Sequence, residues 1–290
     1  MYKKLLSITA LVIIFNSCAS SSRNSDKNNS TIIENGMAVD FPAESKPISL
    51  TDLPRTEEGG FVLAPGYYEA EFKTYCLQPG TPDPTPLDAY LQAPVSGFRK
   101  AMVQTVLLNS RTKPFINQRN VQLLLWSIVS RSDFTKLPSV VKKDASELLT
   151  SKQIFELKGG VMGTVKHVSN SIPNGILKGS NDIKRLFEMG SSSYEMCEKI
   201  AVLREPSQIR RADFKNDQWY KQKENYYVRH FPVSYQKVRI QVYVPGNVLD
   251  SAGKTGGEYL IFDPAGYQTV PANSNSQRLG IGGPVIEVIT

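Results

Sequence analysis

The side chains with the most reactive chemistry in this 290-residue sequence are the thiols of Cys18, Cys76 and Cys197 and the imidazoles of His167 and His230. An imidazole beside a thiol can produce a thiolate nucleophile. Cys76 with His167 or His230 would then form a thiol hydrolase acting on peptidoglycan peptides or proteins. Neither histidine lies in a recognisable motif, so this hypothesis rests on residue types alone.

No other constellation in the sequence indicates an enzyme. There is no His-Glu-x-x-His motif and no cysteine pair with zinc-ligand spacing. The glycines at 256–257 and 280–283 lack the strand, loop and helix of a phosphate-binding site. The acidic clusters at 57–58 and 213–217 are typical of solvated surface. We therefore expect no cofactor and no metal, and a protein that is not an enzyme is favoured.

Two short motifs place Cys76 in another chemical context. Tyr75-Cys76-Leu77 is an aromatic-cysteine-apolar triplet. Val121–Trp126 has the pattern apolar-Gln-x-x-apolar-Trp. Together they resemble the motifs of the thioester domains of bacterial surface adhesins, over roughly residues 60–135. In that family the cysteine and glutamine side chains condense with loss of ammonia, and an amine, typically of lysine, later attacks the thioester. The resemblance implies that Cys76 is the acyl carrier, Gln122 the electrophile and Trp126 the shield.

Helical periodicity is compatible with these roles. The apolar residues Val121, Leu124, Leu125, Ile128 and Val129 follow the i, i+3, i+4, i+7, i+8 pattern of one helix face. Gln122 and Trp126, four residues apart, are neighbours on such a helix. The alternatives remain open: Cys76 can pair with Cys197 in a disulfide, or it can be a buried free thiol.

The N-terminus predicts export and lipid attachment. Lys3 and Lys4 precede an apolar run over residues 5–15, which is too short to span a membrane. The run ends at Phe15-Asn16-Ser17-Cys18, which resembles the lipobox of bacterial lipoproteins. That resemblance implies that residues 1–17 are removed and that Cys18 carries the lipid, whose acyl chains include palmitate. An ordinary cleaved signal with an incidental cysteine is the alternative.

These features predict a protein of the cell envelope, anchored to the membrane by its lipid. Ala19 after the lipid site is compatible with sorting to the outer membrane. Loss of Lys3 and Lys4 lowers the formal charge from +7 to +5, which leaves a mildly basic surface. Because the lysines and arginines are spread along the chain, nucleic acid is not an expected partner. Expected partners are an amine-bearing protein or an envelope polysaccharide, and the oligomeric state is left open.

A third hypothesis needs no special chemistry. A non-enzymatic binding or structural lipoprotein, stapled by Cys76 and Cys197, would recognise a glycan or protein through exposed aromatic residues near lysine and arginine. For most of these residues the favoured alternative is that they belong to the core or rim of a small sandwich. They are Trp219, Tyr220, Tyr226, Tyr227 and Tyr243.

The elements expected to position these groups suggest four parts: a signal peptide over 1–17, a flexible tether over 18–60, a mainly helical domain entered by a strand over 61–204, and a small β-rich module over 205–290. The first strand, near Tyr67–Leu77, should place Tyr68, Ala70, Phe72, Thr74 and Cys76 on one face. Helices are expected after Ser96, after Asn117 or Asn120, after Pro138, after a capping box at Thr150, through Ile183–Phe187 and after Ser192. Strands are expected over Asn225–Phe231, Val238–Val244, Glu258–Phe262 and Val285–Ile289, and Asp263–Pro284 is expected to be a surface loop. The predicted fold class is α+β.

Overall fold

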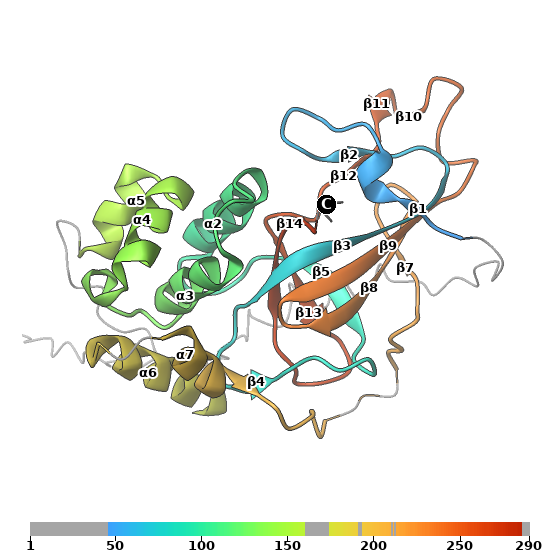
Figure 1. Ribbon diagram of the computed structural model, residues 1–290. Coiled ribbons are helices and arrows are strands. Elements are labelled where there is room, and N and C mark those ends of the chain that lie inside the picture. Colours follow the sequence, from blue (N-terminus) through green and yellow to red (C-terminus); the bar gives the residue numbers. More distant parts are fainter. Residues whose placement is uncertain (1–45, 160–173, 191–192, 210, 212, 286–290) are drawn as a thin grey trace, which may run out of the picture.

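The computed structural model describes residues 46–159, 174–190, 193–209, 211 and 213–285 (Figure 1). The predictions for the signal peptide, for Cys18 and for His167 lie outside these residues, as does the strand predicted over Val285–Ile289 except for its first residue. The fold already includes residues before Phe61, because Ile48 and Ser49 pair with a long strand and Leu50 is fully buried.

Six antiparallel strands close into a β-barrel. Going round the barrel from β3, each strand bonds to the next through β14, β13, β5, β8 and β9, and β9 bonds back to β3. Closure leaves these six strands without a free edge along their paired lengths. The strands are β3 (Gly66–Cys76), β5 (Tyr90–Pro94), β8 (Tyr227–Ser234), β9 (Lys237–Val244), β13 (Tyr267–Pro271) and β14 (Leu279–Pro284).

Short strands and two 3-10 turns complete the β part. β1 (Ile48–Ser49) runs parallel to β3, and β7 (Tyr220–Lys221) extends the sheet beside β8. The remaining pairs are β2 (Phe61–Val62) with β12 (Ile261–Phe262), β10 (Lys254–Thr255) with β11 (Glu258–Tyr259), and β4 (Thr81–Pro82) with β6 (Val202–Leu203). The 3-10 turns are η1 (Leu50–Asp52) and η2 (Phe134–Lys136).

All six described helices lie in the chain between β5 and β8, and they gather beside the barrel (Figure 1). Asn117 caps one of them by accepting a hydrogen bond from the Arg119 N–H at 2.9 Å. The predicted capping box at Thr150 is confirmed, with Gln153 as its partner. The helices are α2 (Lys100–Thr112), α3 (Gln118–Val129), α4 (Ser139–Leu148), α5 (Ser151–Leu157), α6 (Asn174–Glu188) and α7 (Tyr194–Ala201).

The predicted architecture, a helical domain followed by a small β-rich module, is wrong. The described residues form a closed barrel whose first two strands, β3 and β5, precede the helices, while its other four strands follow them. The helices are therefore an insertion into a barrel. The change from helical to strand-like periodicity near Glu205 marks the end of this insertion and not the start of a separate module. The prediction failed because local periodicity carries no information on which distant strands pair.

The prediction of a surface loop over Asp263–Pro284 is also wrong, because this segment contains barrel strands β13 and β14. Its glycines allow α2 to lie close against β14. A Cβ on Gly280 would be 2.9 Å from Leu107 Cδ1, and one on Gly283 would be 2.9 Å from Arg111 Cα. Glycine in a strand permits such a close approach.

The predicted face of the first strand is confirmed. Tyr68, Phe72, Thr74 and Cys76 are buried and Ala70 is half-buried. Phe72 packs with strand residues inside the barrel, whereas Cys76, at the strand's end, packs with residues of the helices. Cys76 thus lies where the barrel meets the helical insertion.

Gly179 holds α6 against the chain that follows β3. A Cβ at this position would be 2.5 Å from Pro79 O and 2.6 Å from Gly80 Cα. Glycine to alanine normally stabilises a helix by about 1 kcal/mol, but here the methyl group would meet backbone that cannot rotate away. We expect Gly179→Ala to lower the free energy of unfolding by about 1–3 kcal/mol in urea denaturation. Asn181→Ala, at an exposed position of α6, is the control and should not lower it; equal effects of the two changes would contradict this packing.

Candidate functional site

Cys76 and Gln122 are in direct contact where β3 meets α3. The Cys76 N–H donates to Gln122 Oε1 at 2.8 Å, and Gln122 Nε2 donates to the Cys76 carbonyl oxygen at 3.0 Å. Cys76 is 0 % and Gln122 2 % exposed. The carboxamide of Gln122 therefore pairs with the backbone of Cys76 as a neighbouring strand would. This places the carboxamide beside the residue that carries the sulfur.

Gln118 fastens the same helix to the same strand one turn earlier. Its Nε2 donates to Thr74 O at 3.2 Å and to Gln236 O at 2.8 Å. Residues four apart share a helix face, so Gln118 and Gln122 together fix how α3 lies across the end of β3. No motif in the sequence points to Gln118, and its spacing of four residues from Gln122 is the signal that could have found it.

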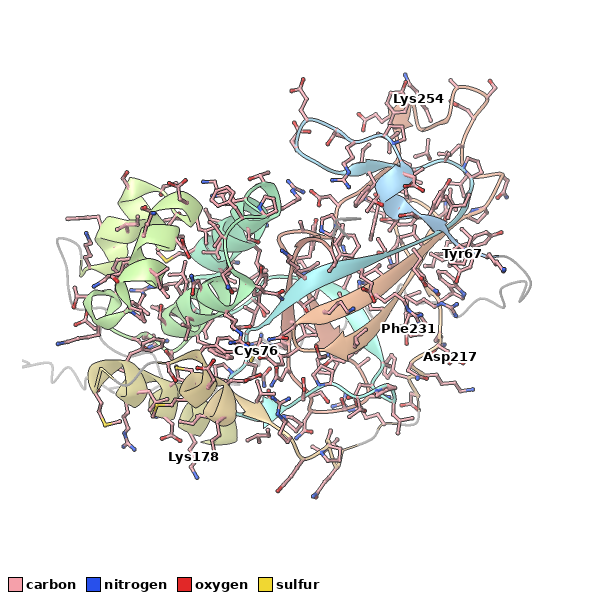
Figure 2. The ribbon with its side chains drawn as sticks, viewed as in Figure 1. Tyr67, Cys76, Lys178, Asp217, Phe231 and Lys254 are labelled. Carbon is pink, nitrogen blue, oxygen red and sulfur yellow. The ribbon has the colours of Figure 1, made fainter. Side chains whose placement is uncertain are left out.

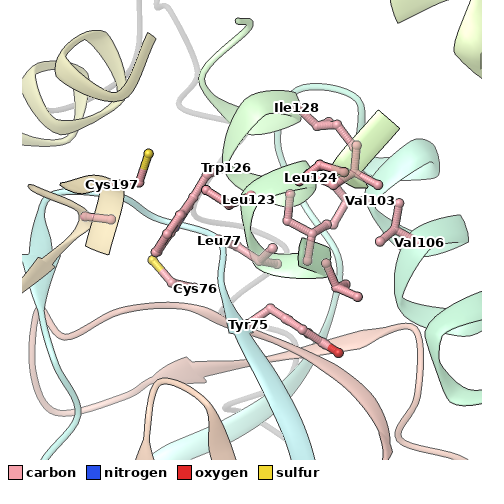
Figure 3. Close-up of a cluster of buried hydrophobic side chains, with 14 of the residues drawn as sticks. Tyr75, Cys76, Leu77, Val103, Val106, Leu123, Leu124, Trp126, Ile128 and Cys197 are labelled. Atoms are coloured by element: carbon pink, nitrogen blue, oxygen red, sulfur yellow. The ribbon is translucent and has the colours of Figure 1, made fainter. Parts of the chain in front are cut away.

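Trp126 lies one helical turn beyond Gln122, and its ring reaches the sulfur of Cys76 (Figure 3). The indole is 0 % exposed. It stacks on Tyr194 with ring centroids 5.7 Å apart and on Tyr235 with centroids 6.5 Å apart. Outside this stack, the Arg119 guanidinium lies 4.9 Å from the centroid of the Tyr194 ring. Three aromatic rings and a cation thus separate Cys76 from solvent on this side, and no local motif predicted Tyr194 or Tyr235.

Burial raises the pKa of the Cys76 thiol to about 12. The indole N–H of Trp126 faces the sulfur and favours the thiolate, but its geometry is too poor for a regular hydrogen bond. Loss of solvation outweighs this contribution. Cys76 is therefore a neutral thiol at physiological pH, unlike the thiolate that a cysteine hydrolase needs.

The structure does not join Cys76 to Cys197. Both are free thiols and both are fully buried. Cys197 lies on α7, and burial raises its pKa to about 12. The Trp126 indole lies beside both residues in the same core (Figure 3).

His230 is not placed to activate a thiol. It lies on β8, is 3 % exposed, and lines a cavity whose described lining contains no cysteine. Burial lowers its pKa to about 3. His230 therefore stays neutral at physiological pH, and among the described residues no imidazole is brought to Cys76 to act as its base.

The aromatic residues considered for surface recognition are largely inside the fold. Trp219, Tyr220 and Tyr226 are buried, and Tyr227 and Tyr243 are half-buried and stacked on each other. The favoured interpretation, that most of these residues belong to the core or its rim, is confirmed, because their rings pack against neighbouring side chains. They do not form the exposed recognition surface of the third hypothesis. Trp219, for example, packs edge-on against Tyr67.

The described residues hold no group of three or more metal-ligating side chains. None of the helices in the described ranges combines the length and the apolar character needed to cross a membrane.

Comparison with protein families, curated proteins and solved structures found no match to this chain. Figure 2 shows Cys76 at the junction of helices and barrel, well apart from Lys254 at the other end of the barrel.

Proposed function

We propose that this chain is a lipid-anchored protein of the cell envelope that captures amines through an internal thioester between Cys76 and Gln122. One observation carries the proposal: the Gln122 carboxamide is held at 2.8 and 3.0 Å against the backbone of Cys76, although 46 residues separate them in the chain. A thioester needs these two side chains within reach of each other. The paired hydrogen bonds hold the carboxamide against the backbone of the residue that carries the sulfur, before any covalent step.

Formation of the bond balances without a cofactor. The Cys76 sulfur adds to Gln122 Cδ, the Cδ–Nε2 bond breaks, and the thiol proton leaves with the amide nitrogen as ammonia. In capture, the nitrogen of a primary amine adds to Cδ and the S–Cδ bond breaks. A proton from the amine returns to the sulfur, which leaves a free thiol and a stable amide on the former Gln122.

The surroundings support both steps. The Cys76 N–H already donates to Oε1, so negative charge developing on that oxygen during either addition has a donor in place. Trp126, Tyr194 and Tyr235 keep water from the bond until an amine arrives. An approaching amine has to displace part of this stack, because Cys76 is 0 % exposed.

The envelope part of the proposal is supported by the N-terminal sequence alone. Residues 1–17 have the charge and apolar run of a signal peptide, and Cys18 follows at the end of that run. Two or three acyl chains on Cys18 would hold the chain at a membrane, since each buried methylene contributes about 0.8 kcal/mol. An exported position gives the thioester access to amines of proteins and of polysaccharides.

Intact mass of the full chain tests the thioester directly. After correction for the substituted atoms, the unreduced wild type should be one ammonia lighter than a variant that cannot form the bond. Methylamine should add one molecule of amine to the wild type and none to Cys76→Ser or Gln122→Glu. We expect each of these changes to abolish amine incorporation completely. Cys76→Ser removes the sulfur, and Gln122→Glu replaces the carboxamide by a carboxylate that has no ammonia to lose.

Cys197→Ser is the matched control, since it removes the other buried thiol and leaves the proposed bond intact. It should incorporate methylamine as the wild type does. A mass deficit of two hydrogens that reductant reverses, and that either cysteine change abolishes, would replace the thioester by a disulfide. A wild-type mass equal to the sequence, with no amine taken up, would overturn the proposal.

A further inference from the structure

A cavity of about 550 Å³ opens at the end of the barrel away from Cys76. Strands β5 and β8 form its floor, the turn from Lys221 to Glu224 one wall, and the segment containing β11 and β12 the other. Its volume is in the range of small-molecule binding sites. It shares no residue with the proposed thioester site.

Two buried polar atoms in the floor have no hydrogen-bond partner among the described residues. They are Gln92 Oε1 on β5 and His230 Nε2 on β8. Tyr90 pairs with His230 across these strands, and Gln92 lies two residues from Tyr90 on the same face. Buried polar atoms are almost always paired in folded proteins. These two exceptions lie on paired strands and belong to residues that line one cavity. Rotation of either side chain would offer its polar atom to a ligand with hydrogen-bonding groups of its own.

The chemistry of the lining favours a neutral, hydroxyl-rich ligand. Gln92 Oε1 needs a donor, and a neutral imidazole nitrogen needs a donor or an acceptor; a hydroxyl group serves as either. Formal charges on the walls balance: two lysines face two glutamates, and the remaining acid, Asp263, pairs with Arg111 at 2.6 Å. A strongly charged ligand would find no excess of opposite charge in the lining of the cavity.

Aromatic side chains complete the site. Tyr259 is 57 % and Tyr267 39 % exposed, and both line the cavity. Lys254 Nζ lies 5.0 Å from the Tyr259 ring centroid and so helps to orient that ring. Exposed tyrosine rings beside two unpartnered polar groups suit the alternating C–H and O–H faces of a sugar.

We infer that this cavity binds a short segment of a neutral glycan, with its hydroxyls on Gln92 and His230 and a C–H face on Tyr267. The inference does not depend on the thioester. Together, however, the two sites would let the protein hold a polysaccharide at one end of the barrel and an amine at the other.

Calorimetric titration of the full chain tests the site, in a detergent without a sugar headgroup. The probes are maltotriose, cellotriose and triacetylchitotriose, with trigalacturonate as an acidic comparison. At least one neutral trisaccharide should bind. Gln92→Leu and Tyr267→Ala should each weaken that binding by about tenfold or more, the equivalent of one good hydrogen bond or contact.

The variants separate binding from folding. Gln92→Leu keeps the volume and removes an unpartnered oxygen, so the fold should be retained even if Tyr267→Ala loosens it. Phe155→Ala, at a 54 % exposed site on α5, should bind like the wild type. No binding of any neutral trisaccharide, preference for trigalacturonate, or unchanged binding by Gln92→Leu would each overturn the inference.

Discussion

Replacing Trp126 with alanine should lower the free energy of unfolding by about 3–5 kcal/mol, the usual cost of deleting a large buried aromatic side chain. Trp126 is 0 % exposed and belongs to the cluster that joins the helices to the end of the barrel. Its removal would leave a cavity between α3, β3 and α7. The stacking on Tyr194 and Tyr235 would be lost as well.

Urea denaturation followed by circular dichroism measures this effect. A lower midpoint with an unchanged dependence on urea would mean lost stability rather than a changed unfolded state. Phe155→Ala removes an aromatic side chain that is 54 % exposed, and as the control it should cost well under half as much. A loss below about 1 kcal/mol for Trp126→Ala would contradict the packing of this tryptophan at the centre of the interface.

A second variant, Trp126→Phe, separates the structural and the protective role of this residue. If the indole only fills space, Trp126→Phe should restore most of the stability and methylamine should react at the wild-type rate. If the indole also covers a thioester, Trp126→Phe should react faster than the wild type although it is nearly as stable. Stability and reactivity are thus expected to change independently.

Local features of this fold were predictable from the sequence because they depend on neighbours in the chain. The Asn117 cap, the capping box at Thr150 and the apolar face of α3 each arise within one or two helical turns. The burial of every second residue of β9 from Val238 to Val244 was equally local, although Gln241 between them is buried too. The thioester motif paired Cys76 with Gln122 through a family resemblance, and the structure brings these residues into contact.

Barrel closure could not be predicted in this way. It joins β3 to β14, whose sequence Leu-Gly-Ile-Gly-Gly-Pro has the composition of a loop. Those glycines are explained by the close approach of α2 and of the Tyr75 ring, which are long-range contacts. The sequence predicts a strand at His230 from local alternation. Its neighbours Tyr90 and Gln92 in the barrel floor could not be predicted, because they too are long-range contacts.

His230 leads to a large pH effect whose sign follows from its burial. Its pKa is lowered to about 3 in the folded chain, against 6.5 when solvated. Between these values the unfolded chain binds a proton that the folded chain does not, so acidification favours unfolding. Stability should fall by about 1.4 kcal/mol per pH unit below 6.5, reaching about 4–5 kcal/mol near pH 3, with no contribution from this residue above 6.5.

The measurement is the difference in free energy of unfolding between the wild type and His230→Leu, taken from pH 7.5 down to pH 3.5. Lys221, Lys223, Glu224 and Glu258 also line the cavity, but they are present in both proteins, so their titration largely cancels. His230→Leu should be increasingly more stable than the wild type as the pH falls, because leucine needs no proton and no partner in the barrel floor. A difference that does not vary with pH would show that His230 takes up its proton as readily in the folded chain as in water, and hence that the cavity floor is open to solvent.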